Sequence, residues 1–479
     1  MKNRFLYIFL FVLSALFYAC SDYDSYSNDP SFRLEFSNDT VRFDTLVSTI
    51  SSPTKTLYVF NHNSNGIRVS NIRLLKGSES LFRVNVDGEY LVQGSGNDYM
   101  IRKNDSILVR IEVTMPESGT NDTVSYSDEL LFSLENGVQQ RVLLTAGAID
   151  AYIVHGMYIQ SDSVLNTDKP YLIYDSLVVA KGAHLFMLPG TRLLMHDSTA
   201  VDVYGQINAT GVVFRGARTD RMFDYLFYDN TPSRWKGITI HEDSYNNVIS
   251  DCDLHSGRWG IIVESSSPSK SSLILHNSII HNIGGDGLRL LNCSAEITNT
   301  QISNTLGDCV YVMGGANTFR HCTIAQYYPL SYNRGDALYV TNLDAENDNC
   351  ELLYLRFFNS VITGYGDDVI MGGISNEYED FMNYTFRNCY LRTIGENDDE
   401  NFFSCKFEDD DMALVGEKNF KVFDTHNFIY DFTPDSLSEI RNMGDPKLMD
   451  ELITDRLGRS RKSDEAPDAG CYEYIMPQK

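Results

Sequence analysis

Residues 273–305, LILHNSIIHNIGGDGLRLLNCSAEITNTQISNT, contain two copies of one short pattern. HNSII at 276–280 and TNTQI at 298–302 begin 22 residues apart. Further copies are SDCDL at 250–254, RHCTI at 320–324, FNSVI at 358–362 and RNCYL at 387–391. An offset of 22 residues fits one coil of a three-sided parallel β-helix, and the longer offsets leave room for loops. The repeats therefore predict a solenoid.

The aligned copies form columns of similar residues. The last position is aliphatic and the position five residues earlier is also apolar: Leu254, Ile280, Ile302, Ile324, Ile362 and Leu391, with Ile249, Leu275, Ile297, Phe319, Phe357 and Phe386. We expect both columns to stack inward and to form one continuous core. A third column is Asp251, Asn277, Asn299, His321, Asn359 and Asn388, whose side chains are expected to hydrogen-bond along a ladder. The fourth is Cys252, Ser278, Thr300, Cys322, Ser360 and Cys389, which favours buried thiols over disulfides.

The chain upstream of the repeats has a different pattern. Residues 31–149 hold seven short alternating runs, among them TKTLYVFN, SILVRIEVTM and QQRVLLTAG, separated by turn residues. This spacing predicts a β-sandwich. The predicted fold class is all-β, with a small β-sandwich at 31–149 followed by a right-handed parallel β-helix at 150–479. Residues from about 440 to 479 are expected to cap the helix.

The first residues have the features of an export signal. Lys2 and Arg4 precede the apolar run FLYIFLFVLSALFYA, and Cys20 follows Ala19. We expect residues 1–19 to be a signal peptide, Cys20 to accept lipid, and residues 20–30 to form a flexible tether. Cleavage that leaves a free Cys20 is the alternative. No transmembrane helix is expected in the mature chain, because no later run approaches the length needed to cross a bilayer.

Composition limits the range of partners. The chain has 479 residues, 43% of them hydrophobic, and a formal net charge of −26, which indicates a globular protein. Nucleic-acid binding requires clusters of Lys and Arg, and none is visible, so no nucleic-acid partner is expected. An acidic polysaccharide would need a local basic patch or bridging cations.

Glycine–aspartate pairs recur after the repeats and give one candidate metal site. Asp286, Asp308, Asp336 and Asp367 are predicted to occupy one turn on successive coils. Such a column suits calcium, the one cofactor that the sequence suggests. The alternative, which we favour, is that each carboxylate caps backbone N–H groups of a sharp turn.

Other residues are candidates for sugar chemistry, although no complete catalytic set is predicted. Asp367 and Asp368 resemble the double aspartate of polygalacturonase-like glycosidases, but the Gly-His-Gly and Arg-x-Lys partners of that family are missing. Lys236 and Arg258 are candidate lyase bases. Trp235 and Trp259 are candidate stacking platforms for sugar rings. For these four residues the alternative is packing at coil corners for the tryptophans and solvation for the basic side chains.

Several motifs resemble those of bacterial surface lipoproteins. FYAC at 17–20 resembles a lipoprotein signal, although Phe17 and Tyr18 depart from it, and the acidic SDYDSYSNDP resembles the surface-export signal of Bacteroidetes. Residues 31–149 resemble Hydin-type immunoglobulin-like domains. DRLGRSRKSDEAPDAGCYEY at 455–474 resembles the ending of bacterial surface β-helix proteins.

The resemblance implies an exported, outer-membrane lipoprotein exposed at the cell surface, with a pectate-lyase-like β-helix. Its expected partners are membrane lipid through Cys20 and a polysaccharide or a surface protein. Because the fold hosts both enzymes and adhesins, we favour non-catalytic glycan binding or adhesion. A polysaccharide lyase or glycoside hydrolase acting in the groove is the alternative, and a purely structural component of a surface assembly is a third.

Overall fold

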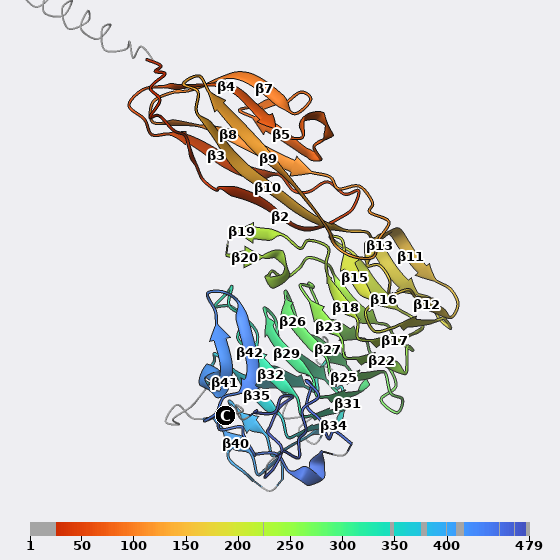
Figure 1. Cartoon of the computed structure of the whole chain (residues 1–479). Coiled ribbons are helices and arrows are strands. Elements are labelled where there is room, and N and C mark those ends of the chain that lie inside the picture. Colours follow the sequence, from red (N-terminus) through yellow and green to blue (C-terminus); the bar gives the residue numbers. More distant parts are fainter. Residues whose placement is uncertain are drawn as a thin grey trace, which may run out of the picture. The chain divides into compact units, whose positions relative to one another are not determined.

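The computed structural model describes residues 25–223, 225–344, 349–374, 381–398, 400–408, 416–449, 451–463 and 465–475. The chain divides into two compact units, Met1–Asp150 and Ala151–Lys479 (Figure 1). Regular structure in the described ranges consists of strands and short 3-10 turns. None of these residues forms a helix with the length and apolar character needed to span a membrane. The predicted signal peptide and Cys20 lie outside the described residues.

The first unit is a sandwich of two five-stranded sheets. One sheet has the order β1 (Glu35–Phe36), β3 (Lys55–Asn61), β8 (Asp105–Val113), β5 (Phe82–Val86) and β6 (Glu89–Tyr90). The other has the order β2 (Thr40–Val47), β10 (Gln139–Ile149), β9 (Val124–Leu134), β4 (Ile67–Leu74) and β7 (Ser95–Ile101). Alternate residues of each strand face inward, and Leu57, Val109 and Phe132 are fully buried in the shared core.

The second unit is a right-handed parallel β-helix with three ladders of strands. It begins with β11 (Tyr152–Ile159) and β13 (Tyr171–Val179). The first ladder continues through β15 (Arg192–Met195), β18 (Val213–Gly216), β23 (Asp253–His255), β26 (Ile279–Ile283), β29 (Gln301–Thr305), β32 (Thr323–Gln326), β35 (Val361–Gly364), β38 (Tyr390–Leu391) and β40 (Lys406–Phe407).

The second ladder comprises β16 (Ala200–Val203), β21 (Gly237–Ile240), β24 (Ile261–Val263), β27 (Leu288–Leu291), β30 (Val310–Met313), β33 (Leu338–Thr341) and β36 (Ile370–Gly373). The third comprises β12 (Ser163–Leu165), β14 (His184–Met187), β17 (Gln206–Thr210), β22 (Asn247–Ser250), β25 (Leu273–His276), β28 (Ser294–Thr298), β31 (Gly315–Arg320), β34 (Leu352–Phe358), β37 (Met382–Arg387) and β39 (Phe402–Phe403). Strands are in parallel register with the next coil, so each coil covers the apolar edge of the one before.

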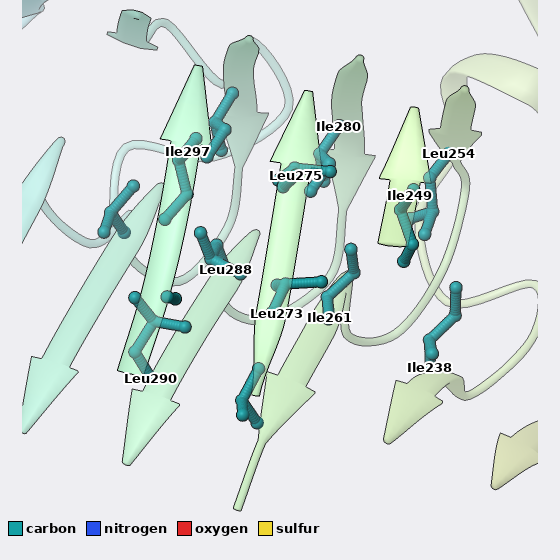
Figure 2. Packing of buried hydrophobic residues seen from close by; sticks show 14 of the residues in the cluster. Ile238, Ile249, Leu254, Ile261, Leu273, Leu275, Ile280, Leu288, Leu290 and Ile297 are labelled. Carbon is teal, nitrogen blue, oxygen red and sulfur yellow. The ribbon is translucent and has the colours of Figure 1, made fainter. Parts of the chain in front are cut away.

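The two predicted inward columns are confirmed. Side chains of all three ladders point into the space between the strands, as Figure 2 shows for Leu254, Ile261 and Leu275. Each residue of the two columns is at most 3% exposed. In the third ladder Phe319, Phe357 and Phe386 stack, with ring centroids 4.4 and 5.0 Å apart.

The polar column occupies a turn with an unusual backbone. Its six members, Asp251, Asn277, Asn299, His321, Asn359 and Asn388, all have φ between 48° and 55°. Asn tolerates this left-handed conformation better than other residues with a Cβ, which explains its frequency in the column. The expected ladder forms in part. The Asn277 amide nitrogen donates to Asp251 Oδ1, and the Asn359 amide nitrogen lies 3.0 Å from His321 Nε2.

The cysteines beyond Cys20 are confirmed as free thiols. All eight are unpaired, and only Cys350 among them is not buried. The fourth column therefore supplies small buried side chains, namely thiols together with the hydroxyls of Ser278, Thr300 and Ser360, each of which donates to a backbone carbonyl oxygen.

The last segment covers the side of the solenoid, whereas the sequence led us to expect a cap. A hairpin of β41 (Phe420–Asp424) and β42 (Ile429–Pro434) precedes it. Cys471 donates its N–H to Thr323 on β32, and Tyr472 donates its hydroxyl to Gln301 on β29. The segment thus packs on outward side chains of the first ladder. The hydroxyl and amide groups of those side chains accept hydrogen bonds from the segment.

Candidate functional site

The outward face of the first ladder carries a group of ionisable side chains. Leu254 and Ile280 point into the core, so their neighbours on the same strands point outward. Asp253 and His255 flank Leu254 on β23, and His281 follows Ile280 on β26. His255 and His281 are in direct register across the two strands. Strand alternation and coil register together therefore bring three side chains into one cluster.

Asp253 lies at the centre of this cluster. Its Oδ1 is 2.8 Å from Nδ1 of His255 and 3.1 Å from Nε2 of His281. The ring centroids of the two imidazoles are 4.9 Å apart. Burial acts to raise the pKa of Asp253, but His281 and His255 outweigh it and hold that pKa well below its usual range.

A second carboxylate fixes His255 from the other side. Asp229, in the 3-10 turn Tyr228–Asn230, has its Oδ1 3.3 Å from Nε2 of His255. Nη2 of Arg215, on β18, lies 2.5 Å from the same oxygen of Asp229. Burial acts to lower the pKa of His255, but its hydrogen bonds to Asp229 and Asp253 raise it to about 9.

A pocket of about 370 Å³ adjoins the cluster at His281. Its floor is the first ladder and its wall is the β41–β42 hairpin. The lining residues are Asn230, Ile279, His281, Asn282, Gln301, Ser303, Asn304, Phe428, Tyr430, Asp431, Phe432, Leu457 and Tyr472. Amide and hydroxyl groups thus face aromatic rings, a combination suited to a polar ligand with apolar faces.

Two residues of the pocket lining, Asn304 and Tyr430, each carry a buried side-chain oxygen without a protein partner. These are Oδ1 of Asn304, on a residue 2% exposed, and the hydroxyl of Tyr430. The structure gives neither atom a hydrogen bond among the described residues. An unpaired buried polar atom costs about 1–3 kcal/mol, so each of these two oxygens would gain a partner if the lining side chains moved to expose it to the pocket.

The predicted aspartate column is a set of turn caps. The Asp308 N–H donates to Asp286 Oδ1 at 3.0 Å, and the Asp336 N–H donates to Asp308 Oδ1 at 2.7 Å. A Cβ on Gly307 would lie 2.4 Å from the Asp286 carboxylate, so glycine is required there. Burial, opposed in part by the Asp336 N–H, raises the pKa of Asp308 to about 6. These contacts match the interpretation that we favoured.

The fourth member of the column is Asp368, and the assignment of Asp367 was wrong. Leu338 pairs with Ile370, so the residue two positions earlier, Asp368, follows Asp336. Asp368 caps the N–H of Ile370, and Asp367 is 95% exposed beside Arg392. The two carboxylates therefore have separate environments, which argues against a paired acid and base.

The column also lacks the geometry of a calcium site. In the described part of the chain, one group brings together three or more ligand atoms with mutual distances within 4.8 Å, and it is Asp253, His255 and His281. Asp286, Asp308 and Asp336 are not part of such a group.

The two tryptophans and their basic neighbours lie apart from the pocket lining. Trp235 is 1% exposed and donates its indole N–H to the carbonyl oxygen of His255, so it packs in the core and presents no face to a sugar. Trp259 is half-buried against Gly285. Lys236 and Arg258 are exposed. The structure does not bring these four residues together with the cluster side chains.

The cluster residues were missed in the sequence, although a signal was present. His255 and His281 each follow the inward residue of successive repeats, Leu254 and Ile280. Aligning the repeats one position further would have shown a histidine column. Asp229 lies outside the repeats, so nothing in the sequence pattern predicted its position beside His255.

Comparison with known proteins supports the solenoid. Residues 149–292 match a family described as "Right handed beta helix region". No curated protein matches the chain.

Similar solved structures include an ASH/PapD-like domain of human CEP192, with 15% identity, a TM-score of 0.18, and coverage of 26% of this chain and 90% of that one. A family 123 glycoside hydrolase from Clostridium perfringens has 7% identity, a TM-score of 0.19, and coverage of 27% and 30% respectively. A protein of unknown function from Porphyromonas gingivalis has 12% identity, a TM-score of 0.17, and coverage of 26% and 59%. Similarity at this level carries no argument about function.

Proposed function

We propose that this β-helix protein binds a glycan in the pocket between the first ladder and the β41–β42 hairpin. The observation that carries this proposal is the lining of the pocket, in which amide and hydroxyl side chains of the first ladder lie beside the aromatic residues Phe428 and Tyr430. Sugar hydroxyls can both donate and accept hydrogen bonds, which suits a lining of amide and hydroxyl side chains. The rings of Phe428 and Tyr430 offer apolar contact to the faces of the sugar.

The charge of the pocket favours a neutral glycan. Its lining residues include Asp431 and neither Lys nor Arg. The whole chain is strongly acidic, with a formal net charge of −26. A uronate-rich polymer would therefore be repelled by the negative charge, whereas a neutral glycan would meet no electrostatic repulsion.

The setting that we propose for this function is the bacterial cell surface. Cys20, after the signal-like residues 1–19, would anchor the chain in the outer membrane, with the sandwich as a Hydin-type spacer. The predicted tether at 20–30 is wrong in its described part, because Tyr26 forms a bridge with Gly66 of the sandwich and Asn136 donates to the Asp29 carbonyl oxygen. Labelling with a palmitate analogue in a Bacteroidetes host tests the anchor. The wild type should be labelled and Cys20→Ala should not, and equal labelling of both would contradict it.

A panel of neutral and acidic polysaccharides tests the binding proposal. Purified mature chain is mixed with each polymer, and protein and polymer are followed by size-exclusion chromatography for a day. Co-elution with a neutral polymer that keeps its length is the expected result. Absence of binding to every polymer would contradict the proposal.

A second candidate is cleavage of the glycan by a lyase or hydrolase. It is favoured by the position of His281, which belongs both to the pocket lining and to the cluster of Asp253 and His255. Acid–base groups at the edge of a binding pocket are a common arrangement in enzymes. Shortening of the bound polymer in the same assay, lost in His281→Gln, would replace binding alone with this function.

A further inference from the structure

We infer that Asp253, His255 and His281 form a binding site for one divalent transition-metal ion, with zinc as the best fit. This inference does not depend on glycan binding.

The three ligand atoms already converge. Asp253 Oδ1 lies 2.8 Å from Nδ1 of His255 and 3.1 Å from Nε2 of His281. Ligands of tetrahedral zinc lie roughly 3.3 Å apart, given bonds of about 2.0–2.1 Å. The ion therefore requires Asp253 Oδ1 to move only a few tenths of an ångström from each imidazole nitrogen, and all three ligand atoms already lie within 4.8 Å of one another. The positive charge of the ion would then replace the imidazole protons that now lie between Asp253 and the two histidines.

The surroundings of His255 fit a metal ligand. Its second nitrogen, Nε2, faces Asp229 Oδ1 at 3.3 Å, and Arg215 holds that carboxylate at 2.5 Å. Histidines that bind zinc commonly donate their other N–H to a carboxylate, which fixes the tautomer and the orientation of the ring. Asp229 would thus keep the proton on Nε2 and leave the Nδ1 lone pair for the ion.

The position of the cluster leaves room for a further ligand. The side chain of His255 is 9% exposed, so that side of the site is closed. The side chain of His281 is 27% exposed and lines the pocket. Three protein ligands with an open fourth position are typical of zinc sites that bind water or a substrate. A water molecule or a polar group of a ligand bound in the pocket would occupy the fourth position.

The ligand set selects the class of ion. Two imidazoles and one carboxylate suit zinc, copper, nickel or iron, whereas calcium and magnesium prefer oxygen ligands. The site is therefore distinct in chemistry from the calcium column that the aspartates suggested.

Metal titration of the purified mature chain tests the inference. The protein is treated with a chelator, dialysed, and titrated with zinc chloride by calorimetry, and bound zinc is counted by mass spectrometry after desalting. We expect one equivalent of zinc and a rise in the thermal midpoint on addition of zinc. Cobalt(II) should give visible absorption bands of a low-symmetry site.

His281→Gln and Asp253→Asn remove ligands, and His276→Gln is the matched control. His276 lies on β25 with its Nδ1 2.7 Å from Thr298 and outside the cluster. The control should bind one equivalent, and both ligand variants should bind none at the same zinc concentration. Asp229→Asn, which leaves the ligands intact, should weaken zinc about 10–100-fold.

Two results would overturn the inference. One is a wild-type protein that retains no zinc above the level of a protein without histidine clusters. The other is equal zinc binding by the wild type, His276→Gln and His281→Gln. If the ligand variants fail to fold by circular dichroism, the wild-type stoichiometry and the affinity of Asp229→Asn decide the matter, and an unchanged affinity in Asp229→Asn counts against the site.

Discussion

The side chain of Asn359 combines two tasks at one turn of the polar column. Its φ of 48° is left-handed, which a residue with a Cβ adopts at a cost unless its side chain compensates. Its amide nitrogen donates to the Asp445 carbonyl oxygen at 3.1 Å, and its Oδ1 accepts the Asp445 N–H at 2.9 Å. The same residue therefore shapes the coil and attaches the last segment of the chain.

Substitution of Asn359 should separate these two tasks. Asn359→Gly keeps the backbone conformation and loses the hydrogen bonds, so we expect the free energy of unfolding to fall by about 2–3 kcal/mol. Asn359→Ala should cost roughly 1 kcal/mol more, because alanine also strains the turn. Urea denaturation measures both. Asn388→Gly is the control, since the Asn388 side chain donates one hydrogen bond among the described residues, to the Met443 carbonyl oxygen at 3.3 Å, and its loss should cost less. Equal stability of the Gly and Ala variants would contradict the assigned strain.

Asp308 should make stability depend on pH. Its pKa is raised from 3.8 to about 6 in the folded chain, so folding favours the protonated form. This contribution is complete below pH 3.8 and is lost as the pH rises through 6. Asp308→Asn retains an acceptor for the Asp336 N–H without the charge. It should therefore match the wild type at pH 4 and exceed its stability by about 1–2 kcal/mol at pH 7.5, a two-unit shift being worth about 3 kcal/mol before solvent screening.

Unfolding in urea at the two pH values, with exposed Asp122→Asn as the control, checks this. A variant that is less stable than the wild type at pH 7.5, together with stabilisation of the wild type alone by calcium, would restore the calcium interpretation of the column.

At the scale of elements, the last segment depends on a buried ion pair. Arg461 pairs with Glu473, and both side chains are at most 2% exposed. Arg461 also donates to Asn299 Oδ1 at 2.7 Å, which ties the segment to the polar column. Burial raises the pKa of Glu473 to about 8 even though Arg461 opposes the shift. Removing the arginine would leave a buried carboxylate without its partner.

Arg461→Ala should release this segment from the solenoid. We expect the rate of amide hydrogen exchange in residues 453–475 to rise by at least tenfold. If the segment unfolds together with the first ladder, the free energy of unfolding should fall by about 3–5 kcal/mol. Exchange in the sandwich strands β8 and β9 serves as the internal control and should not change. Unchanged protection of residues 453–475 would show that the ion pair does not hold them.

The repeats predicted the elements of the solenoid well because one coil can bury its apolar face only against the next. Ile280, Ile302 and Ile324 recur 22 residues apart, and this spacing alone set the register. The prediction failed where loops intervene. The Gly-Asp pair at 366–367 was aligned with the earlier pairs, but the strand register begins one residue later, at Asp368.

At the scale of the whole molecule, the candidate site depends on parts that no repeat specifies. Asp229 comes from a turn between β18 and β21, and Tyr430 comes from the C-terminal hairpin. Neither segment follows the 22-residue pattern, so neither its path nor its contacts with the first ladder could be predicted. Local periodicity determined the scaffold, and non-local packing assembled the pocket.

Glycan affinity of the Tyr430→Phe variant tests the central claim most directly. Tyr430 lines the pocket, and its hydroxyl is buried and has no hydrogen-bond partner among the described residues. Its removal should leave the thermal midpoint unchanged or slightly higher, while affinity for the bound neutral glycan falls about 5–150-fold, the equivalent of 1–3 kcal/mol. Tyr158→Phe on β11, whose ring is 60% exposed, is the matched control and should bind as the wild type does. Wild-type affinity in Tyr430→Phe would contradict glycan binding in this pocket.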